Sequence, residues 1–265
     1  MARALLLLIA LCGSIWITAA EPDKVTTAVI GADASVSQYL VALPHFAYGG
    51  GWRTQIVVGN SSGTAAVVTL SYFGNDGKPL NLSIGGVAAD HTTITVPAYG
   101  AQTVEPDWQG ATTTAGWVAL TYTHSGLKVQ GIIMWHNPAD PADKYVEATA
   151  PIVSQSGTAC IIPMPPGSSP LTMPYDETEG RFSGYGFANT TNVPVTMGLT
   201  FYDQNGERIA QYTELLPAFG HNQFLLRDKV PSVANRKGTM HLTGQGVAPL
   251  GLRFTPFNTL TTWMP

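Results

Sequence analysis

The sequence contains few charged residues. Only 11% of its 265 residues are Asp, Glu, Lys or Arg, whereas a typical soluble domain has about a quarter. The 13 basic residues are outnumbered by 17 acidic ones, so the chain lacks the basic surface that neutralises phosphates in nucleic-acid-binding proteins. Hydrophobic residues make up 45% of the chain, which is too much for a disordered protein. We therefore expect a folded protein with no nucleic-acid partner.

Cysteine is almost absent, and one of the two cysteines lies in a segment that we expect to be removed. Residues 1–20 begin with a single Arg3, continue with an apolar run from Ala4 to Ile17 and end in small residues. This pattern is typical of a secretory signal peptide, and the run is shorter than the roughly 20 residues that cross a bilayer. We expect cleavage after Ala20, a secreted, extracellular or periplasmic protein, and no membrane span in the mature chain. A lipoprotein anchored at Cys12 is the minor alternative.

The mature chain would keep only Cys160, so it could form no internal disulfide, and core burial would have to stabilise the fold. Long helices are also excluded, because 28 glycines and 19 prolines are spread along the sequence and both residues break helices. We find no convincing amphipathic helix, although residues 226–234 have room for a single helical turn.

The chain repeats itself. Residues 55–80 align with residues 184–209 at a constant offset, which pairs Asn60 with Asn189 and Gly77 with Gly206. Residues 97–100 align with residues 217–220 at a smaller offset, because the first copy carries an extra loop at 83–91. The order of these matches predicts an internal duplication.

Each copy has the pattern of short strands. Residues 68–72 and 198–202 alternate apolar and polar side chains, which is the period of a half-buried strand. Residues 75–77 and 204–206 are rich in Asn, Asp and Gly, which favour hairpin turns. We therefore predict an all-β protein of two tandem immunoglobulin-like antiparallel β-sandwich domains.

Composition sets the predicted boundaries. Residues 1–20 form the signal peptide, and residues 21–38 a polar N-terminal segment. The first sandwich spans residues 39–150. Residues 151–173 are rich in proline and form a stiff connector. The second sandwich spans residues 174–265.

The run His45-Phe46-Ala47-Tyr48-Gly49-Gly50-Gly51-Trp52 resembles the opening of a β-sandwich repeat common in secreted bacterial proteins. The usual form of this opening is Phe-Ala-Asp-Gly-Gly-Gly-Trp, and here Tyr48 replaces the Asp. Residues 216–221 and 251–254 are similar to a companion form in the second copy. The family has no assigned reaction, so the resemblance implies secretion and a sandwich fold, and it names no catalytic residue.

Aromatic residues are the sequence's candidates for ligand binding. Secreted sandwiches often bind sugars or peptides by stacking them on aromatic rings, although most such rings fill cores. Our candidates are Tyr48, Trp52, Trp108 and Trp135. If Ile132 and Met134 face the core as Leu252 and Phe254 of the second copy would, then Ile133 and Trp135 face outward. We expect that apolar outer face to be a contact surface for the other domain or a partner.

Acidic residues are the candidates for a metal site. Asp176, Glu177 and Glu179 lie within four residues and could form a calcium loop, although their spacing is not that of a known calcium loop. The simpler interpretation is that these three acids lie in a solvated loop and bind no metal. The six histidines are not spaced like zinc ligands. We therefore expect no cofactor apart from a possible Ca²⁺.

The sequence as a whole favours a secreted or cell-envelope protein without catalytic residues, acting as a binding, adhesion or structural module. Its expected partner is a cell-surface glycan or protein. The alternative is a carbohydrate-active or other hydrolytic enzyme that uses loop carboxylates.

Overall fold

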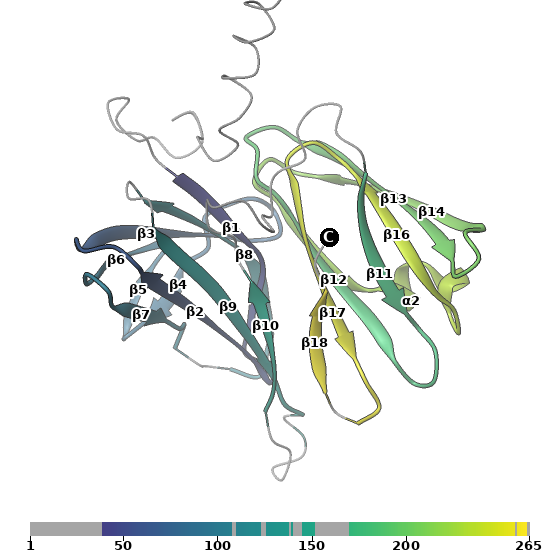
Figure 1. Cartoon of the computed structure of the whole chain (residues 1–265), viewed down its shortest axis with the longest axis horizontal. Helices are drawn as coiled ribbons and strands as arrows, with labels where there is room; N and C mark the ends of the chain where they lie inside the picture. The colour runs from purple at the N-terminus through teal and green to yellow at the C-terminus, as the bar shows by residue number, and fades with distance from the viewer. Residues whose placement is uncertain are drawn as a thin grey trace, which may run out of the picture.

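The computed structural model describes residues 39–107, 110–122, 126–137, 139, 145–151, 170–257 and 259–263. Within these ranges the chain is built almost entirely of antiparallel β-sheets, which confirms the predicted all-β class. Figure 1 shows two groups of strands side by side, the first in purple and teal and the second in green and yellow. Among the described residues, no helix is long and apolar enough to cross a membrane.

The first group of strands forms two four-stranded sheets. One has the order β1-β8-β3-β6 and the other the order β10-β9-β2-β7, while β4 and β5 pair as a small hairpin. That hairpin occupies the segment predicted as an extra loop. The strands are β1 (Tyr39–Tyr48), β2 (Trp52–Asn60), β3 (Ala66–Phe73), β4 (Leu82–Ile84), β5 (Val87–Ala89), β6 (His91–Val96), β7 (Ala101–Val104), β8 (Thr114–Tyr122), β9 (Leu127–Trp135) and β10 (Val146–Pro151).

The second group also forms two four-stranded sheets, in the orders β11-β16-β13-β14 and β15-β12-β17-β18. Its first strand starts inside the segment predicted as a connector, three residues before the predicted domain. A single helical turn lies in the predicted place. The elements are β11 (Leu171–Asp176), β12 (Phe182–Asn189), β13 (Val195–Asp203), β14 (Arg208–Leu216), β15 (His221–Leu225), α2 (Leu226–Lys229), the 3₁₀-helix η1 (Pro231–Val233), β16 (Lys237–Thr243), β17 (Val247–Phe254) and β18 (Leu260–Trp263).

The two groups have the same strand order. If β11 is matched to β1, β12 to β2, β13 to β3 and β16 to β8, both sheets of the second group reproduce the neighbours of the first. The predicted alignment pairs β2 with β12 and β3 with β13. The shared topology therefore supports the predicted duplication, while a common immunoglobulin-like ancestor stays a prediction.

Each group buries the apolar side of its strands between its two sheets. Leu70 and Tyr72 of β3 are buried in the first core, and Leu199 and Phe201 of β13 in the second. These are the inward positions that the alternating pattern predicted. Each group is thus a β-sandwich whose core joins the inner faces of two sheets.

The sandwiches pack against each other through small side chains. Ala42 and Ala119 of the first sandwich and Ala188 and Ala248 of the second form one buried cluster with Trp117. Alanine leaves room for the two sheets to approach closely. The indole N–H of Trp117 also donates a hydrogen bond across the interface to the carbonyl oxygen of Phe219, at 2.7 Å. The interface is therefore a packed and hydrogen-bonded contact.

Candidate functional site

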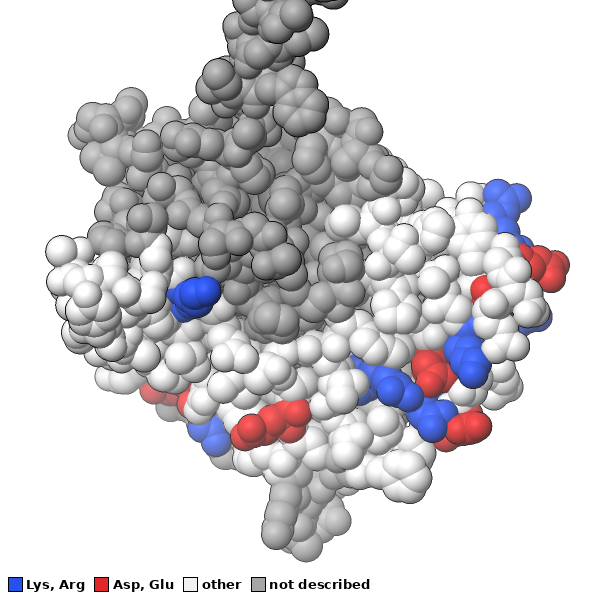
Figure 2. Space-filling model, viewed as in Figure 1, with Lys and Arg blue, Asp and Glu red and all other residues white. Residues whose placement is uncertain are grey.

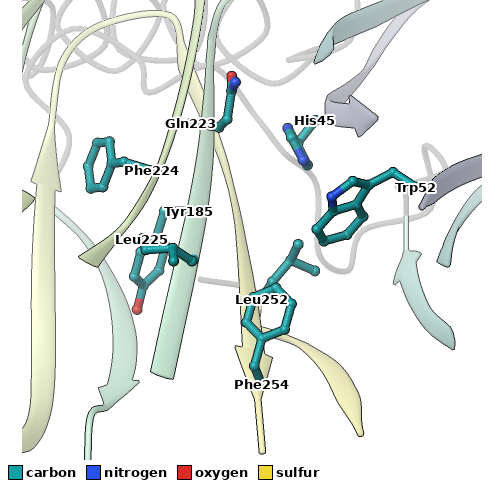
Figure 3. Close-up of a pocket in the computed structure, with 9 residues that line it drawn as sticks. His45, Trp52, Tyr185, Gln223, Phe224, Leu225, Leu252 and Phe254 are labelled. Atoms are coloured by element: carbon teal, nitrogen blue, oxygen red, sulfur yellow. The ribbon is translucent and has the colours of Figure 1, made fainter. Parts of the chain in front are cut away.

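A cavity of about 240 Å³ lies where the two sandwiches meet. Its described walls come from β1 and β2 of the first sandwich and from β12, β15 and β17 of the second (Figure 3). Aromatic and aliphatic side chains dominate them. The lining residues are His45, Trp52, Gly184, Tyr185, Gln223, Phe224, Leu225, Leu252 and Phe254.

The three-glycine turn places Trp52 beside the end of β1. Gly49, Gly50 and Gly51 all have positive φ, at 75°, 56° and 90°, a region that glycine enters without steric cost. A Cβ atom on Gly50 would lie 2.3 Å from the hydroxyl oxygen of Thr113. The turn closes with a hydrogen bond from the Trp52 N–H to the carbonyl oxygen of Gly49, at 3.0 Å. The glycines therefore serve a tight reversal that starts β2 at the cavity.

Trp52 connects the first sandwich to the second. Its ring lies 6.2 Å from that of Trp135 on the neighbouring strand and 6.2 Å from that of Phe254 on β17, the latter edge to face. Edge-to-face packing is a favourable arrangement of aromatic rings. Of the four aromatic residues predicted as ligand-binding candidates, Trp52 is the one found among the described lining residues.

The other aromatic candidates have different places. Tyr48 stacks on Phe46 and packs against the first core. Trp135 contacts Trp52 but is not among the cavity-lining residues. Trp108 lies outside the described residues.

The predicted outward orientation of Ile133 is wrong. Ile133 is fully buried in the core of the first sandwich, and Ile132 on the opposite side of β9 is only half-buried. The error came from the second copy, where Leu252 had been taken to face its own core. Leu252 instead packs with the core cluster of the first sandwich. The equivalent positions Ile132 and Leu252 therefore do face the same way, but each points outward from its own sandwich.

Two buried histidines meet at the interface. Nδ1 of His45 on β1 lies 3.1 Å from Nε2 of His221 on β15, and the rings are stacked with centroids 5.2 Å apart. Nδ1 of His221 lies 2.7 Å from Oδ1 of Asn75, again across the interface. Burial lowers the pKa of His45 to about 4. Burial, with the neighbouring His45, lowers the pKa of His221 well below its ordinary value, so both rings are neutral at pH 7.

This arrangement fixes where the protons are. The amide oxygen of Asn75 can only accept a hydrogen bond, so Nδ1 of His221 donates to it. Nε2 of His221 is then unprotonated and accepts from Nδ1 of His45. A neutral imidazole carries one proton, so Nε2 of His45 is left as an acceptor. The cavity thus has a defined acceptor at His45, and Gln223 and the indole N–H of Trp52 are further polar groups in its mainly apolar wall.

The three acids of the predicted calcium loop form ion pairs with arginines. Oδ2 of Asp176 lies 3.1 Å from Nη2 of Arg253, and Glu179 pairs with Arg181. Figure 2 shows basic and acidic residues intermixed near the lower edge of the molecule, while most of the described surface on this face is uncharged. Burial raises the pKa of Asp176, but hydrogen bonds from Thr178 and the nearby arginines outweigh it and hold the pKa below its ordinary value.

Glu177 is the most buried of the three acids, at 3% exposed. Oε2 accepts a hydrogen bond from Nε of Arg227 at 2.8 Å, and Oε1 accepts one from the Ser183 N–H at 2.7 Å. Burial raises the pKa of Glu177, and these bonds offset that effect in part. Each of the three carboxylates has an arginine partner that a calcium ion would have to displace. No cluster of three or more potential metal ligands occurs among the described residues.

Local sequence patterns do not distinguish His45, His221 or Gln223 as site residues. The two histidines were visible only as parts of the family-like segments, and nothing in their local pattern distinguishes a buried pair from surface residues. They are 176 positions apart, and only the packing of two domains brings them together.

No family model matches the chain, and no curated protein matches it. Among solved structures, the comparison pairs it with Bacteroides uniformis beta-glucuronidase at 9% sequence identity and a TM-score of 0.17. The match covers 91% of this chain and 27% of that one, so the chain spans little more than a quarter of that protein's length. We draw nothing from so weak a likeness.

Proposed function

We propose that the chain is an exported binding protein of the cell envelope or extracellular space, without a catalytic role of its own. In this proposal the cavity between the two sandwiches is its binding site. The observation that carries the proposal is the wall of that cavity, where Trp52, Tyr185 and Phe254 from two domains converge. The signal-like pattern of residues 1–20 supports export.

The chemistry of the cavity favours binding over hydrolysis. Apolar clefts between domains are common ligand sites. Hydrolysis of a glycoside requires two carboxyl groups on either side of the bond, and the described lining residues include neither Asp nor Glu. Asp176 and Glu177, which the sequence offered as calcium ligands, are held by arginines.

The proposal is tested by filling the cavity. Gly184 lines it from β12, and a Cβ atom there would meet Phe254 at 3.3 Å and Leu225 at 3.6 Å, so a larger side chain at Gly184 occupies the space. Gly59 on β2 is a matched control, because a Cβ there would meet only the Lys128 carbonyl oxygen, at 3.8 Å. The variants are Gly184→Val and Gly59→Val, since valine suits a strand.

The purified mature chain and both variants are applied to an array of glycans and cell-wall fragments. We expect the unchanged chain and Gly59→Val to bind the same components, and Gly184→Val to lose that binding at least tenfold. A folded Gly184→Val that binds as well as the unchanged chain would show that the cavity is not the site. Failure of the unchanged chain to bind any component would refute the proposed role.

A further inference from the structure

The cavity wall carries a hydrogen-bond acceptor on His45 and a donor on Trp52, besides the buried and unpartnered Oε1 of Gln223. The hydrogen-bond chain from Asn75 through His221 leaves Nε2 of His45 with a free lone pair. The indole Nε1 of Trp52 carries a proton and can only donate. Among the described residues, neither atom has a hydrogen-bond partner. Figure 3 shows one ring nitrogen of His45 directed toward the indole of Trp52.

A hydroxyl group satisfies both atoms at once. Its O–H can donate to Nε2 of His45, and its oxygen lone pair can accept from the N–H of Trp52. Because His45 is 6% exposed, its bond to the hydroxyl would be largely shielded from bulk water, and a shielded hydrogen bond contributes more than one at an exposed surface.

The rest of the wall selects what carries the hydroxyl. Figure 3 places His45 and Gln223 at one end of the cavity and Phe254 at the other, with Tyr185 and Leu252 between them. A flat apolar ring fits against these side chains. A saccharide would bring a hydroxyl on almost every ring carbon, more than His45, Trp52 and the unpartnered Oε1 of Gln223 can bond, and hydroxyls buried without partners would be costly. A carboxylate is disfavoured because the described lining contains neither Lys nor Arg.

We propose that the cavity binds a phenol, with the ring against the aromatic wall and the hydroxyl between His45 and Trp52. This inference rests on the proposed binding function and specifies its ligand. A free phenolic compound and an exposed tyrosine side chain share this chemistry.

The test compares probes that share one ring and differ in one group. Phenol, anisole and benzoate are titrated calorimetrically into the purified mature chain at pH 7, together with methyl glucoside. We expect phenol to bind at least threefold more tightly than anisole, which has no donor, and at least tenfold more tightly than benzoate or methyl glucoside. Equal affinity for phenol and anisole, no binding of phenol, or tighter binding of benzoate or of the sugar overturns the inference.

Two variants locate the effect. Trp52→Phe keeps an aromatic ring but removes the N–H, and we expect it to reduce the preference for phenol over anisole at least twofold. Trp263→Phe is the matched control, since Trp263 lies on β18 and is not among the described lining residues, and its preference should be unchanged. An unchanged preference in Trp52→Phe, or an equal loss in both variants, contradicts the assigned position of the hydroxyl.

The source of the phenol is tested with N-acetyl-tyrosinamide. Tighter binding than phenol supports a tyrosine side chain as ligand, and weaker binding supports a free phenolic compound. If binding on the array depends on Gly184 but the protein does not prefer phenol to anisole, this inference fails and the proposed function stands. If no component of the array binds, the proposed function fails first.

Discussion

Nδ1 of His45 in the first sandwich lies 3.1 Å from Nε2 of His221 in the second, and both rings are buried. A neutral histidine pair can share one proton along this line, but two protonated rings at that distance would repel each other. The contact between the sandwiches therefore cannot hold both rings charged, and it should respond to pH.

The first prediction is that acid weakens the folded state between pH 6.5 and pH 4. An unfolded histidine has a pKa of about 6.5, whereas burial lowers the pKa of His45 to about 4 and that of His221 well below its ordinary value. Below pH 6.5 the unfolded chain therefore binds more protons than the folded one. Stability is complete above pH 6.5 and falls toward pH 4, by up to about 1.4 kcal/mol per pH unit for each histidine.

Urea unfolding at several pH values measures this effect. His221→Gln removes one buried imidazole and should flatten the pH dependence of the free energy of unfolding in this range. His91→Ala is the control, because His91 is exposed and lies beside Asp90, and it should leave the slope unchanged. An identical slope in His221→Gln and the unchanged chain would contradict the prediction.

The second prediction concerns Gly186, which faces His45 across the interface. A Cβ atom on Gly186 would lie 2.5 Å from Cβ of His45 and 2.8 Å from its Cγ. Gly186→Ala should therefore force the sandwiches apart locally and lower the free energy of unfolding by about 1–3 kcal/mol. Gly59→Ala, which has space for a methyl group, is the control. If the two alanine variants unfold at the same urea concentration, the sandwiches do not pack as described.

Local patterns were enough to predict the strands and turns of each copy. The alternation in residues 68–72 and 198–202 predicted which side chains face the core, because one face of each strand is buried and the other is solvated. The predicted repeat also pairs Asn60 with Asn189, whose side chains make equivalent hydrogen bonds.

The domain interface was the part that the sequence did not reveal. β17 is buried on both faces, so Leu250 and Leu252 are buried against the first sandwich while Val247 belongs to the second core. A strand that is buried on both sides has no polar face, so its sequence does not show which residues point to which side. This is why Ile133 was assigned to the wrong face, and why the cavity and the pair of His45 and His221 were not predicted.

The third prediction tests the equivalence of the two copies. Nδ2 of Asn60 donates to the carbonyl oxygen of Thr64 at 2.7 Å, and Nδ2 of Asn189 donates to that of Val193 at 2.8 Å. Each Oδ1 accepts the backbone N–H two residues later. Because both side chains are buried, replacing either with alanine leaves backbone groups unpaired, at a cost of about 1–3 kcal/mol.

Thermal unfolding of Asn60→Ala and Asn189→Ala measures these costs. We expect both variants to melt at clearly lower temperature, with similar losses. Asn81→Ala, at an exposed position, should melt like the unchanged chain. A large loss at one asparagine and none at the other would mean that the two turns are not equivalent in energy.

The fourth prediction concerns Glu177 and Arg227. Removing the guanidinium in Arg227→Met leaves the 3%-exposed carboxylate of Glu177 without its cation. Breaking a fully buried pair costs about 3–5 kcal/mol, but Arg227 is 39% exposed, so solvent moderates the loss and we expect about 2 kcal/mol. The double variant Glu177→Gln/Arg227→Met should recover most of it, since a neutral amide needs no counter-ion.

The pH dependence distinguishes an electrostatic cause from lost packing. Burial already raises the pKa of Glu177, and loss of Arg227 should raise it further. The folded variant then takes up a proton at a higher pH than the unfolded chain does, so its deficit relative to the unchanged protein should shrink as pH falls from 7 to 5. Lys78→Met, which breaks an exposed pair with Asp76, should have almost no effect at any pH. A deficit in Arg227→Met that stays constant over this range would show that the arginine acts through packing of its side chain rather than through its charge.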